Sequence, residues 1–474
     1  MSTFPRPRPR RAVVIGGGLT GTLAAAALAE QVDEVTVVER DTLPREPSPR
    51  KSLAQARHAH ILWSGGARAM EQLLPGVVDE WLAAGARRIP LPSALVSMTP
   101  QGWFRRGDAE MQFLISCTRD LLDFCVRRRV LELPQVRVLE RTSVSGLLGS
   151  AGRVRGVRAH SVDGGVQEFP ADLVVDASGR GTRVVQWLSG LGVGPVREAE
   201  VDAGVLYASR LYQAPPGVGD FPLVNVQPQA NRGTPGRGSI IAPVEGGRWL
   251  VTLCGTRGAH PPQSPDGFER FAREVRDPVV GDLIAHAEPL GDEVTLSRST
   301  YNRRRFLEKA RGWPEGFVAL GDAVATYNPV YGHGMSVAAQ GVLALRAELR
   351  RNGPQALGLA RRVQRAVARP IDMAWQMAAG QDVLYPDATG PRPTLLERAG
   401  QRYIDRLTAT ATSRPYATRS LLEVMTLSAP ATGLFRPALV LTALRGPSRA
   451  PLTAPPLTAE ERASVQCDRP GSPA

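Results

Sequence analysis

Three segments of the chain place glycines and an acidic side chain after a short apolar run, a combination suited to holding a ligand by phosphates and hydroxyls. In the first, "GGGLTG", Gly16, Gly18 and Gly21 have the spacing G-x-G-x-x-G. The first glycine of this motif permits a tight turn, the second lets the backbone approach a pyrophosphate, and the third lets a helix pack closely on a strand. Leu19 and Thr20 stand inside the motif, where N–H groups of a helix start would face the phosphates.

The residues around this motif supply the context that it needs. Residues 12–15 are expected to form a strand, the alanine-rich run from Leu19 a helix, and "EVTVVE" a second strand ending at Glu39. A carboxylate about twenty residues after the motif can accept hydrogen bonds from ribose hydroxyls. The pattern indicates dinucleotide binding and does not distinguish FAD from NAD.

The second segment, "ADLVVDASGRGTRV", is a continuous apolar run followed by Asp176 and Gly179. Such runs are typical of buried parallel strands, and ligands of open α/β sheets bind at the carboxyl ends of these strands. Asp176 is therefore a candidate ligand contact. The alternative is a capping role, in which its side chain holds the start of a helix beginning near Thr182.

The third segment is "GFVALGDAVATYNPVYGHGM", where Asp322 ends a strand and Gly332 and Gly334 precede a long helical pattern. Asp322 could bind a polyol such as a ribityl chain. The helix start would direct N–H groups at an acceptor that gains negative charge, such as the N1/C2=O edge of a flavin. The alternative is that Asp322 is a helix cap and the glycines are turn formers.

The composition is that of a globular protein, with 43% hydrophobic and 22% charged residues in 474, a length that suggests two or three subdomains. The formal net charge is +13, but nearly all the basic residues are scattered arginines, and the lysines are Lys51 and Lys309. Because no basic stripe with interleaved aromatics is present, the charge does not predict nucleic-acid binding.

Neither secretion nor membrane insertion is predicted. The four cysteines lack C-x-x-C spacing and fit a reducing compartment. The basic N-terminus precedes a glycine-broken run rather than a signal peptide, and no apolar stretch reaches the ~18 residues of a transmembrane helix. We therefore expect a cytoplasmic protein without a transmembrane segment.

The order of predicted elements indicates an α/β fold with an inserted domain. Residues 10–87, 115–196 and 301–350 are expected to form a discontinuous nucleotide-binding domain. The strand-rich stretches 88–114 and 197–300 are expected to form a mostly antiparallel sheet domain that lies over it and binds the substrate.

The remainder of the chain is predicted to contain helices followed by a tail. Residues 351–445 have helical periodicity in several segments. Residues 446–474 are rich in Pro, Ser and Thr and are expected to be disordered.

Together the three segments resemble the FAD fingerprints of the FAD-dependent monooxygenase superfamily, the group with a hydroxylase-type FAD fold and no separate NADPH domain. The stretches "RKSLAQARHAHILWSGGARAMEQLLPG", "NRRRF" and "NPVYGHGMS" are similar to flavin epoxidases of actinobacterial polyether-ionophore pathways, relatives of squalene epoxidase. The resemblance covers most of residues 10–445. It implies a Rossmann-like FAD-binding fold with an inserted substrate domain and a C-terminal helical part.

The resemblance also implies which residues bind FAD. The glycine motif would hold the pyrophosphate, Glu39 and Arg40 the adenosine ribose, and Arg119 a phosphate or the ribose; the alternative for Arg119 is a solvated arginine in a first helical turn. "KSLAQARHAH" would lie on one side of the flavin ring and "NPVYGHGM" beside it. The predicted cofactor-binding residues are Gly16, Gly18, Leu19, Thr20, Gly21, Glu39, Arg40, Lys51, Gln55, Arg57, His58, Arg119, Asp176, Gly179, Asp322, Pro329, Gly332, Gly334 and Met335.

Three histidines could instead indicate a metal or a general base. His58 and His60 have no Asp, Glu or Cys partner at ligand spacing, so no metal site is predicted, and both are expected to belong to the loop beside the flavin. His333 lies between two glycines, where a loop role is expected rather than acid–base work. No nucleophile elbow is present, since "WSGG" at Ser64 is not G-x-S-x-G.

The activity implied by the resemblance is monooxygenation in which the flavin does the chemistry. Reduced FAD would take O2 to form a C4a-hydroperoxide that transfers oxygen to an alkene, so no side chain is predicted to be catalytic. The predicted function is epoxidation of an apolar polyene, a polyketide or terpenoid, in antibiotic or other secondary metabolism. NADPH or NADH would supply electrons transiently or through a flavin reductase, because a second G-x-G-x-x-G is absent.

Three alternatives stay open. A flavin-dependent aromatic or polyketide hydroxylase would need an acid–base group, for which Tyr327 and His333 are candidates. A flavin halogenase would need a W-x-W-x-I-P signature and a channel lysine, and "GRWLVTLCG" does not match. A non-enzymatic carrier on this fold would have lost Asp322 or the glycine turns, which are present. The candidate substrate-pocket residues, each with core packing as its alternative, are Trp103, Phe113, Tyr207, Trp249 and Tyr327.

Overall fold

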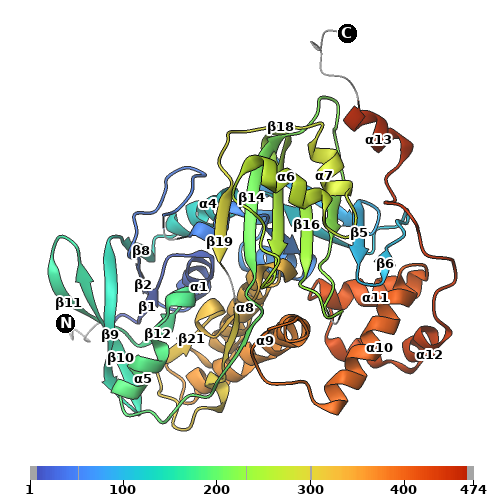
Figure 1. The fold of residues 1–474 in the computed structure, drawn as a ribbon. Coiled ribbons are helices and arrows are strands. Elements are labelled where there is room, and N and C mark those ends of the chain that lie inside the picture. The colour runs from blue at the N-terminus through green and yellow to red at the C-terminus, as the bar shows by residue number, and fades with distance from the viewer. Residues whose placement is uncertain (1–7, 52, 231, 299–300, 467–474) are drawn as a thin grey trace, which may run out of the picture.

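The computed structural model of the protein describes residues 8–51, 53–230, 232–298 and 301–466. Figure 1 shows an α/β body on one side, a large sheet capped by helices above it, and a group of C-terminal helices beside both. The predicted fold class, a Rossmann-like α/β fold with an inserted, mostly antiparallel sheet and C-terminal helices, is confirmed.

The central sheet of the α/β body, as far as the structure describes the chain, has five parallel strands in the order β21–β12–β1–β2–β8. The last residue of β1, Ile15, is in register with Asp176 of β12 and Val38 of β2. The carboxyl ends of these strands therefore meet at one edge, as ligand sites of open sheets require. Their bounds are β1 (Arg11–Ile15), β2 (Glu34–Val38), β8 (Val136–Leu139), β12 (Leu173–Asp176) and β21 (Phe317–Ala319).

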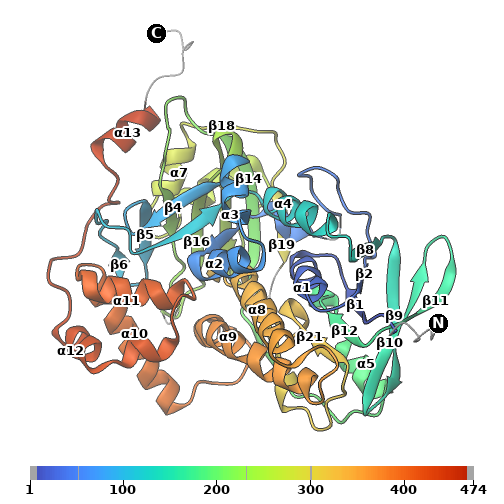
Figure 2. The ribbon, with the colours of Figure 1, turned by 180° about the vertical axis from the view of Figure 1, so that it is seen from behind.

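Helices and a small sheet cover the central sheet. Helix α1 (Leu19–Ala29) packs between α4 (Arg119–Leu131) and α8 (Gly334–Asn352), as Figure 2 shows from behind. Ala24, Ala25, Ala26 and Ala27 are almost fully buried, because small side chains let the helix lie close to its neighbours. An antiparallel sheet packs against the opposite face, where β10 contacts β12; it consists of β9 (Thr142–Ser150), β10 (Arg153–Ser161) and β11 (Gly165–Pro170). Helix α5 (Val184–Gly190) follows β12.

The inserted domain is built on a large sheet in the order β18–β14–β17–β16–β15–β5–β6, with β19 also paired to β14. Its pairs are antiparallel apart from β15 with β5. Helices α6 (Pro265–Arg273) and α7 (Val279–Ile284) cover its outer face. The strands are β5 (Leu95–Thr99), β6 (Gly102–Trp103), β14 (Leu206–Gln213), β15 (Leu223–Val226), β16 (Arg237–Val244), β17 (Arg248–Gly255), β18 (Glu288–Pro289) and β19 (Thr295–Arg298).

Two smaller sheets join the bodies. In one, β4 (Arg87–Leu91) and β7 (Gln112–Ser116) pair with β3 (Ile61–Trp63), so the predicted domain boundary at residue 88 runs through a sheet. Because β3 directly follows the loop expected beside the flavin, residues 51–60, this sheet ties that loop to the inserted domain. The other sheet has the order β13–β20–β22, with β13 (Glu198–Asp202), β20 (Tyr301–Arg305) and β22 (Ala325–Thr326).

The C-terminal helices begin with α9 (Leu359–Asp382), which packs along α8. A separate apolar core then holds together α10 (Leu395–Ala411), α11 (Pro415–Met425) and α12 (Pro437–Arg445). None of the helices in the described ranges combines the length and apolarity that crossing a bilayer demands.

The prediction of a disordered tail is wrong for residues 446–466. This segment runs from α12 over the inserted domain and ends in α13 (Ala459–Gln466), where Leu457 and Val465 enter the same core as Trp249. Composition could not show this, because two buried apolar residues suffice to anchor a Pro-rich segment. Residues 467–474, with Cys467, lie outside the described residues.

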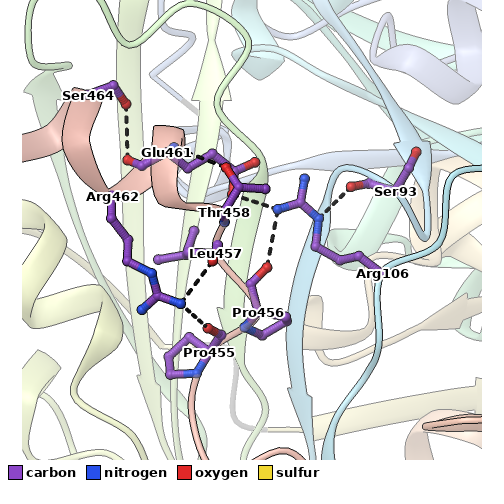
Figure 3. A network of polar contacts seen from close by, with 9 residues as sticks. All are labelled: Ser93, Arg106, Pro455, Pro456, Leu457, Thr458, Glu461, Arg462 and Ser464. Atoms are coloured by element: carbon purple, nitrogen blue, oxygen red, sulfur yellow. Dashed lines mark hydrogen bonds and ion pairs between the residues drawn. The ribbon is translucent and has the colours of Figure 1, made fainter.

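A polar network fixes the same segment, as Figure 3 shows. Arg106 donates from Nη1 to Glu461 Oε2 at 2.6 Å and to the carbonyl of Pro456 at 3.3 Å, and from Nε to the carbonyl of Ser93. Thr458 and Glu461 form a reciprocal cap at the start of α13, with Glu461 N donating to Thr458 Oγ1 and Thr458 N donating to Glu461 Oε2.

Candidate cofactor site

The first glycine segment forms the turn that its spacing predicts. Gly16 has φ +98°, and a Cβ there would lie 2.7 Å from the carbonyl oxygen of Ala177. A Cβ on Gly21 would lie 1.8 Å from the carbonyl oxygen of Gly16, so only glycine lets α1 start this close to β1. Gly18 is the N-cap of α1 and carries no side-chain cap.

Two helix starts open onto free space at this edge of the sheet. A Cβ on Gly18, before α1, or on Gly334, the first residue of α8, would meet no atom within 4 Å. Neither helix has a side-chain cap, which leaves backbone N–H groups and a partial positive charge available to an anionic ligand. The residues therefore fit an extended group with a pyrophosphate at one helix and a hydrogen-bond acceptor at the other.

The structure brings the three predicted segments together. Gly321 lies against Thr20, so that a Cβ on the glycine would stand 2.6 Å from the threonine Oγ1. Arg180, from the second segment, has its Nε 4.0 Å from Asp322 Oδ2 in the third. Three stretches far apart in the sequence thus converge where β1, β12 and β21 end.

The carboxylate of Glu39 is buried, and most of its hydrogen-bond acceptor positions are taken by groups of the protein itself. Its Oε2 accepts from Gly17 N at 2.6 Å and lies 3.0 Å from Arg50 Nη2, and its Oε1 accepts from Asp41 N at 2.9 Å. A carboxylate has about four acceptor positions, so one remains for a ribose hydroxyl. Arg40 is exposed at the rim.

Arg50 is a site residue that sequence reasoning missed. Its side chain is 7% exposed, and it donates to the carbonyl of Gly17 at 3.1 Å while it pairs with Glu39. Arg50 thereby joins the glycine turn of the first segment to Glu39. The sequence signal for Arg50 was only that it is an arginine in a Pro-, Arg- and Ser-rich loop. Arg45 lies in the same loop, and spacing alone does not show which of the two arginines reaches the site.

The prediction that Asp176 contacts the ligand is wrong. Asp176 has no exposed surface, its Oδ1 accepts from the N–H and hydroxyl of Ser178, and its Oδ2 accepts from Thr182 Oγ1 at 2.6 Å. Burial raises the pKa of Asp176, and these hydrogen bonds lower it. The carboxylate holds the turn that carries Gly179 and Arg180. This role is similar to the capping role that the sequence left as the alternative.

Asp322 and Arg119 lie close enough for the charge of Arg119 to affect the pKa of Asp322. The Asp322 side chain is 31% exposed. Burial raises its pKa, while Arg180, Arg119 and Arg305 lower it through their charges. Arg119 is not solvated as the alternative reading held: it is 8% exposed, and its Nε donates to Asp123 at 2.7 Å.

The loop that carries Pro329 and Gly332 packs against β3. Trp63 Nε1 donates to the carbonyl of Tyr331 at 3.1 Å, and Gly332, at φ +65°, leaves no room for a Cβ beside Ile61. His333 is buried and its Nε2 lies 3.0 Å from the carbonyl of Met425, the loop role that was expected. Met335 is buried in the first turn of α8.

His58 is held on the inner face of the large sheet by a chain of hydroxyls. Ala59 N donates to Thr252 Oγ1, which is 2.6 Å from Ser209 Oγ, which in turn is 2.7 Å from His58 Nδ1. When Thr252 donates to Ser209 and Ser209 donates to Nδ1, the proton of a neutral His58 lies on Nε2; the reverse direction places it on Nδ1. Nε2 is buried without a partner among the described residues. Burial lowers the pKa of His58 to about 4 and that of His60 to about 3, so both rings are neutral at neutral pH.

The other predicted residues of this loop lie further out. Lys51 is exposed and Gln55 is half-buried. Arg57 forms a surface ion pair with Glu293 of the inserted domain at 3.1 Å. The structure does not bring Arg57 to the other site residues. Within the described ranges, no group of His, Cys, Asp and Glu could hold a metal ion.

Most of the predicted substrate-pocket residues are core residues. Trp103 and Trp249 are 2% and 1% exposed and point to the outer face of the large sheet, into the core under α6 and α7. Tyr327 is buried and donates to the carbonyl of Ile371 at 3.3 Å, and Phe113 lies under the guanidinium of Arg88. For Trp103 and Trp249, the alternation of the strands decided the outcome and the pocket prediction is wrong; for Tyr327 and the half-buried Phe113 it stays a prediction.

Tyr207 is on the inner face, against the third segment. Its hydroxyl accepts from Val330 N at 3.0 Å, and its ring centroid is 5.8 Å from that of His58. The same face continues into an apolar group that sequence reasoning missed, here called the Trp63 cluster. Its buried members are Trp63, Ile89, Leu91, Leu114, Leu223 and Leu422.

Residues 12–191 match the family model described as "FAD dependent oxidoreductase". The chain is 32% identical over 412 residues to Protein Rv3254 of Mycobacterium tuberculosis, covering 85% of this chain and 86% of the relative. Residues 12–191 belong to the FAD-dependent oxidoreductase family. This oxidoreductase is also 27% identical over 357 residues to a kynurenine 3-monooxygenase of Salinispora arenicola, covering 71% of this chain and 72% of that protein.

Solved structures share the fold of this FAD-dependent oxidoreductase. The flavin-dependent halogenase CmlS superposes with a TM-score of 0.62 at 18% identity, over 89% of this chain and 78% of that chain. The p-nitrophenol 4-monooxygenase PnpA of Pseudomonas putida superposes with a TM-score of 0.60 at 14% identity, over 88% of this chain and 99% of that chain. The predicted membership of the flavin monooxygenase superfamily and the FAD cofactor are supported; likeness to polyether epoxidases is not tested by these relatives.

Proposed function

We propose that this oxidoreductase is an FAD-dependent monooxygenase that epoxidises an apolar polyene, of polyketide or terpenoid type, in secondary metabolism. The observation that carries the proposal is that both groups considered for acid–base work are engaged elsewhere. Tyr327 donates to the carbonyl of Ile371, and burial raises its pKa further above its ordinary value. His333 lies against the carbonyl of Met425, and burial lowers its pKa to about 4. Adding an oxygen atom to an alkene needs no base to ionise the substrate.

The cofactor would be held by the residues already assembled. FAD, when bound, carries two electrons from NADPH or NADH to O2, so that one oxygen atom reaches the substrate and the other leaves as water. Gly18 and the start of α1 would bind the pyrophosphate, Glu39 the adenosine ribose and Asp322 the ribityl chain. The start of α8 after Gly334 would face the ring with its N–H groups.

The rest of the chain would exclude water and position the substrate. The Trp63 cluster itself is buried, and the apolar surface beside it consists of partly buried side chains that pack against it: Ile61, Ala94, Leu95, Met111 and Ile240. This surface adjoins the segment from Asn328 to Tyr331, because Trp63 donates to the carbonyl of Tyr331. An apolar polyene would bind there by loss of apolar area from water. Closing this region keeps water away from the reacting oxygen.

The second candidate is a flavin-dependent aromatic or polyketide hydroxylase. The kynurenine 3-monooxygenase and p-nitrophenol 4-monooxygenase relatives act on aromatic compounds, as their names say, which favours this reading. It would need a base other than Tyr327 or His333. His58 is neutral, and with its proton on Nε2 it could donate a hydrogen bond through that atom, whereas with its proton on Nδ1 it could accept one there.

A halogenase is less favoured, although halogenases share the fold. Of the two lysines, Lys51 is exposed, and Lys309 lies over the ring of Phe306 at 4.9 Å. Neither belongs to the Trp63 cluster. A non-enzymatic carrier is less favoured because the glycine turns and Asp322 converge on one site.

The test begins with purified protein. Flavin absorbance that remains after gel filtration, or appears on adding FAD, is expected; a protein that takes up no FAD would overturn the proposal. Oxidation of NADPH or NADH, with and without a flavin reductase, is then followed with polyenes and with phenols. Epoxide from polyenes is the expected product. Oxygenated product from phenols alone would establish the hydroxylase instead.

A further inference from the structure

The last residue of α9, Asp382, is a buried acid in an unfavourable place. It is 1% exposed and ends the helix, where the macrodipole disfavours negative charge. Among the described residues it forms no ion pair, and burial raises its pKa. Such a group is retained only where hydrogen bonds offset the cost of burying it.

Three donors from two other segments supply those hydrogen bonds. Asp382 Oδ2 accepts from Asn302 Nδ2 at 2.7 Å and from Asn328 Nδ2 at 2.9 Å, and Oδ1 accepts from Tyr331 Oη at 2.8 Å. Asn302 is on β20, whereas Asn328 and Tyr331 flank the pair Pro329–Val330 in the loop before α8. One carboxylate thus joins α9, β20 and the third glycine segment.

Backbone contacts fix the orientation of both amides. Asn302 Oδ1 accepts from Asn328 N at 2.7 Å, and Asn328 Oδ1 accepts from Val330 N at 3.3 Å. Because each amide oxygen already faces an N–H group, each amide nitrogen must face Asp382. The atom at the Oδ2 position of residue 382 therefore has to be an acceptor that carries no proton.

The site leaves Asp382 no direct role with a substrate. Asn328, Val330 and Asp382 line a cavity together with Tyr385, and its volume is about 10 Å³, room for one water molecule. Val330 N, which donates to Asn328 Oδ1, also donates to the hydroxyl of Tyr207 in the inserted domain at 3.0 Å. The segment from Asn328 to Tyr331 is thus held by Asp382 and by the inserted domain.

We propose that Asp382 is a positioning residue for the FAD ring, which fixes the Asn328–Tyr331 segment and thereby the backbone that leads to Gly334 at the start of α8. The proposal rests on the proposed function, which lays the ring along this segment. Asp382 acts through the loop and touches neither cofactor nor substrate. Its contribution is to keep the backbone N–H groups at the start of α8 at a fixed distance from the flavin ring.

The experiment compares Asp382→Ala with Asp382→Asn in the full-length chain, stripped of flavin and titrated with FAD. Asparagine keeps an oxygen for the two amides and turns its amino group toward Tyr331 Oη, which can accept. We expect Asp382→Ala to weaken FAD binding by about tenfold or more and to change the visible spectrum of the bound flavin. Asp382→Asn should stay within about threefold of the wild type and keep its spectrum. Gln376→Ala, an exposed position on the same helix, is the control.

The outcomes separate this inference from the proposed function. Wild-type protein that binds no FAD would refute the function itself. Wild-type protein that binds FAD, with an alanine variant of equal affinity and spectrum, refutes only the role of Asp382, as does an asparagine variant as impaired as alanine. If Asp382→Ala does not give a cooperative unfolding transition, Asn302→Ala replaces it, because it removes one donor to Oδ2 and the acceptor of Asn328 N. The same loss of affinity and spectral change is expected, and unchanged binding refutes the proposal.

Discussion

The backbone of Gly321 lies against the side chain of Thr20, so close that a Cβ on the glycine would stand 2.6 Å from the threonine hydroxyl oxygen. Gly321 also has φ +58°, in the left-handed region. The contact sets the distance between the first and third glycine segments. A ligand that binds across the two segments therefore depends on a glycine at position 321.

Gly321→Ala is therefore expected to destabilise the protein and to reduce its FAD content. The strain of a left-handed alanine and the contact with Thr20 together should cost about 1–3 kcal/mol in the free energy of unfolding. Gly312→Ala is the matched control, since Gly312 has φ +69° but open space around it. Denaturant unfolding and flavin absorbance measure both effects. Equal losses in the two variants would show that backbone strain alone, without the Thr20 contact, accounts for the change.

Asp322→Ala is expected to lower FAD affinity by about ten- to hundredfold without lowering the stability of the flavin-free protein. A carboxylate that binds ribityl hydroxyls contributes charge-assisted hydrogen bonds, each worth about 1.5–3 kcal/mol. Burial is the largest influence on the pKa of Asp322 and raises it, so the ionised group does not stabilise the empty fold. FAD titration and thermal unfolding of the flavin-free variant test the two parts. Unchanged flavin binding would show that the ribityl chain lies elsewhere.

The sequence predicted the backbone of the site better than its side chains. Gly16, Gly18 and Gly21 constrain a strand, a turn and a helix within a few residues, so local spacing was sufficient. Asp176 was assigned to the ligand because it ends a strand, but whether a strand-end carboxylate faces outward or into its own turn depends on Ser178 and Thr182. Local pattern does not resolve that choice.

Contacts between distant segments account for the other errors. Arg50 closes over Glu39 from a loop without periodicity, and Asp382 reaches the third segment from a helix some fifty residues later in the chain. Trp103 and Trp249 lie on inserted strands as expected, but the alternation of the strand sends them to the outer face under α6 and α7. Which face of the sheet meets the flavin is set by the docking of whole domains.

His58 is expected to be neutral, with its proton on Nε2, down to about pH 4. This tautomer follows when Thr252 donates to Ser209 and Ser209 donates to Nδ1 along the chain that starts at Ala59 N, and burial lowers the pKa of the ring. Histidine-selective 15N labelling reports both properties, and the six histidines keep the spectrum tractable. Ser209→Ala removes the donor to Nδ1 and should allow the other tautomer. A wild-type ring protonated on Nδ1 would contradict the direction of the chain.

His333→Gln is expected to make the stability of the protein less sensitive to acid. Burial lowers the pKa of His333 from 6.5 to about 4, so the unfolded chain binds more protons than the folded one between these values. The contribution of neutral His333 is fully present above 6.5 and is lost as the pH falls toward 4. Glutamine can still donate to the carbonyl of Met425. The difference in unfolding free energy between wild type and variant should therefore shrink by about 3 kcal/mol across this window, and parallel pH profiles would contradict the assignment.

Leu457→Ala is expected to lower the free energy of unfolding by about 2–4 kcal/mol, because the segment after α12 is part of the core of the inserted domain. Leu457 is 8% exposed in the core that contains Trp249 and Phe268, and the hydrogen bonds of Arg106 hold its neighbours in place. Leu395→Ala is the control, since Leu395 is 84% exposed and should change stability by less than about 0.5 kcal/mol. Denaturant unfolding at matched protein concentration measures both. Equal, small effects in the two variants would mean that residues 446–466 lie on the inserted domain without stabilising it. The expected difference would show that this segment connects the C-terminal helices to the large sheet and stabilises that sheet.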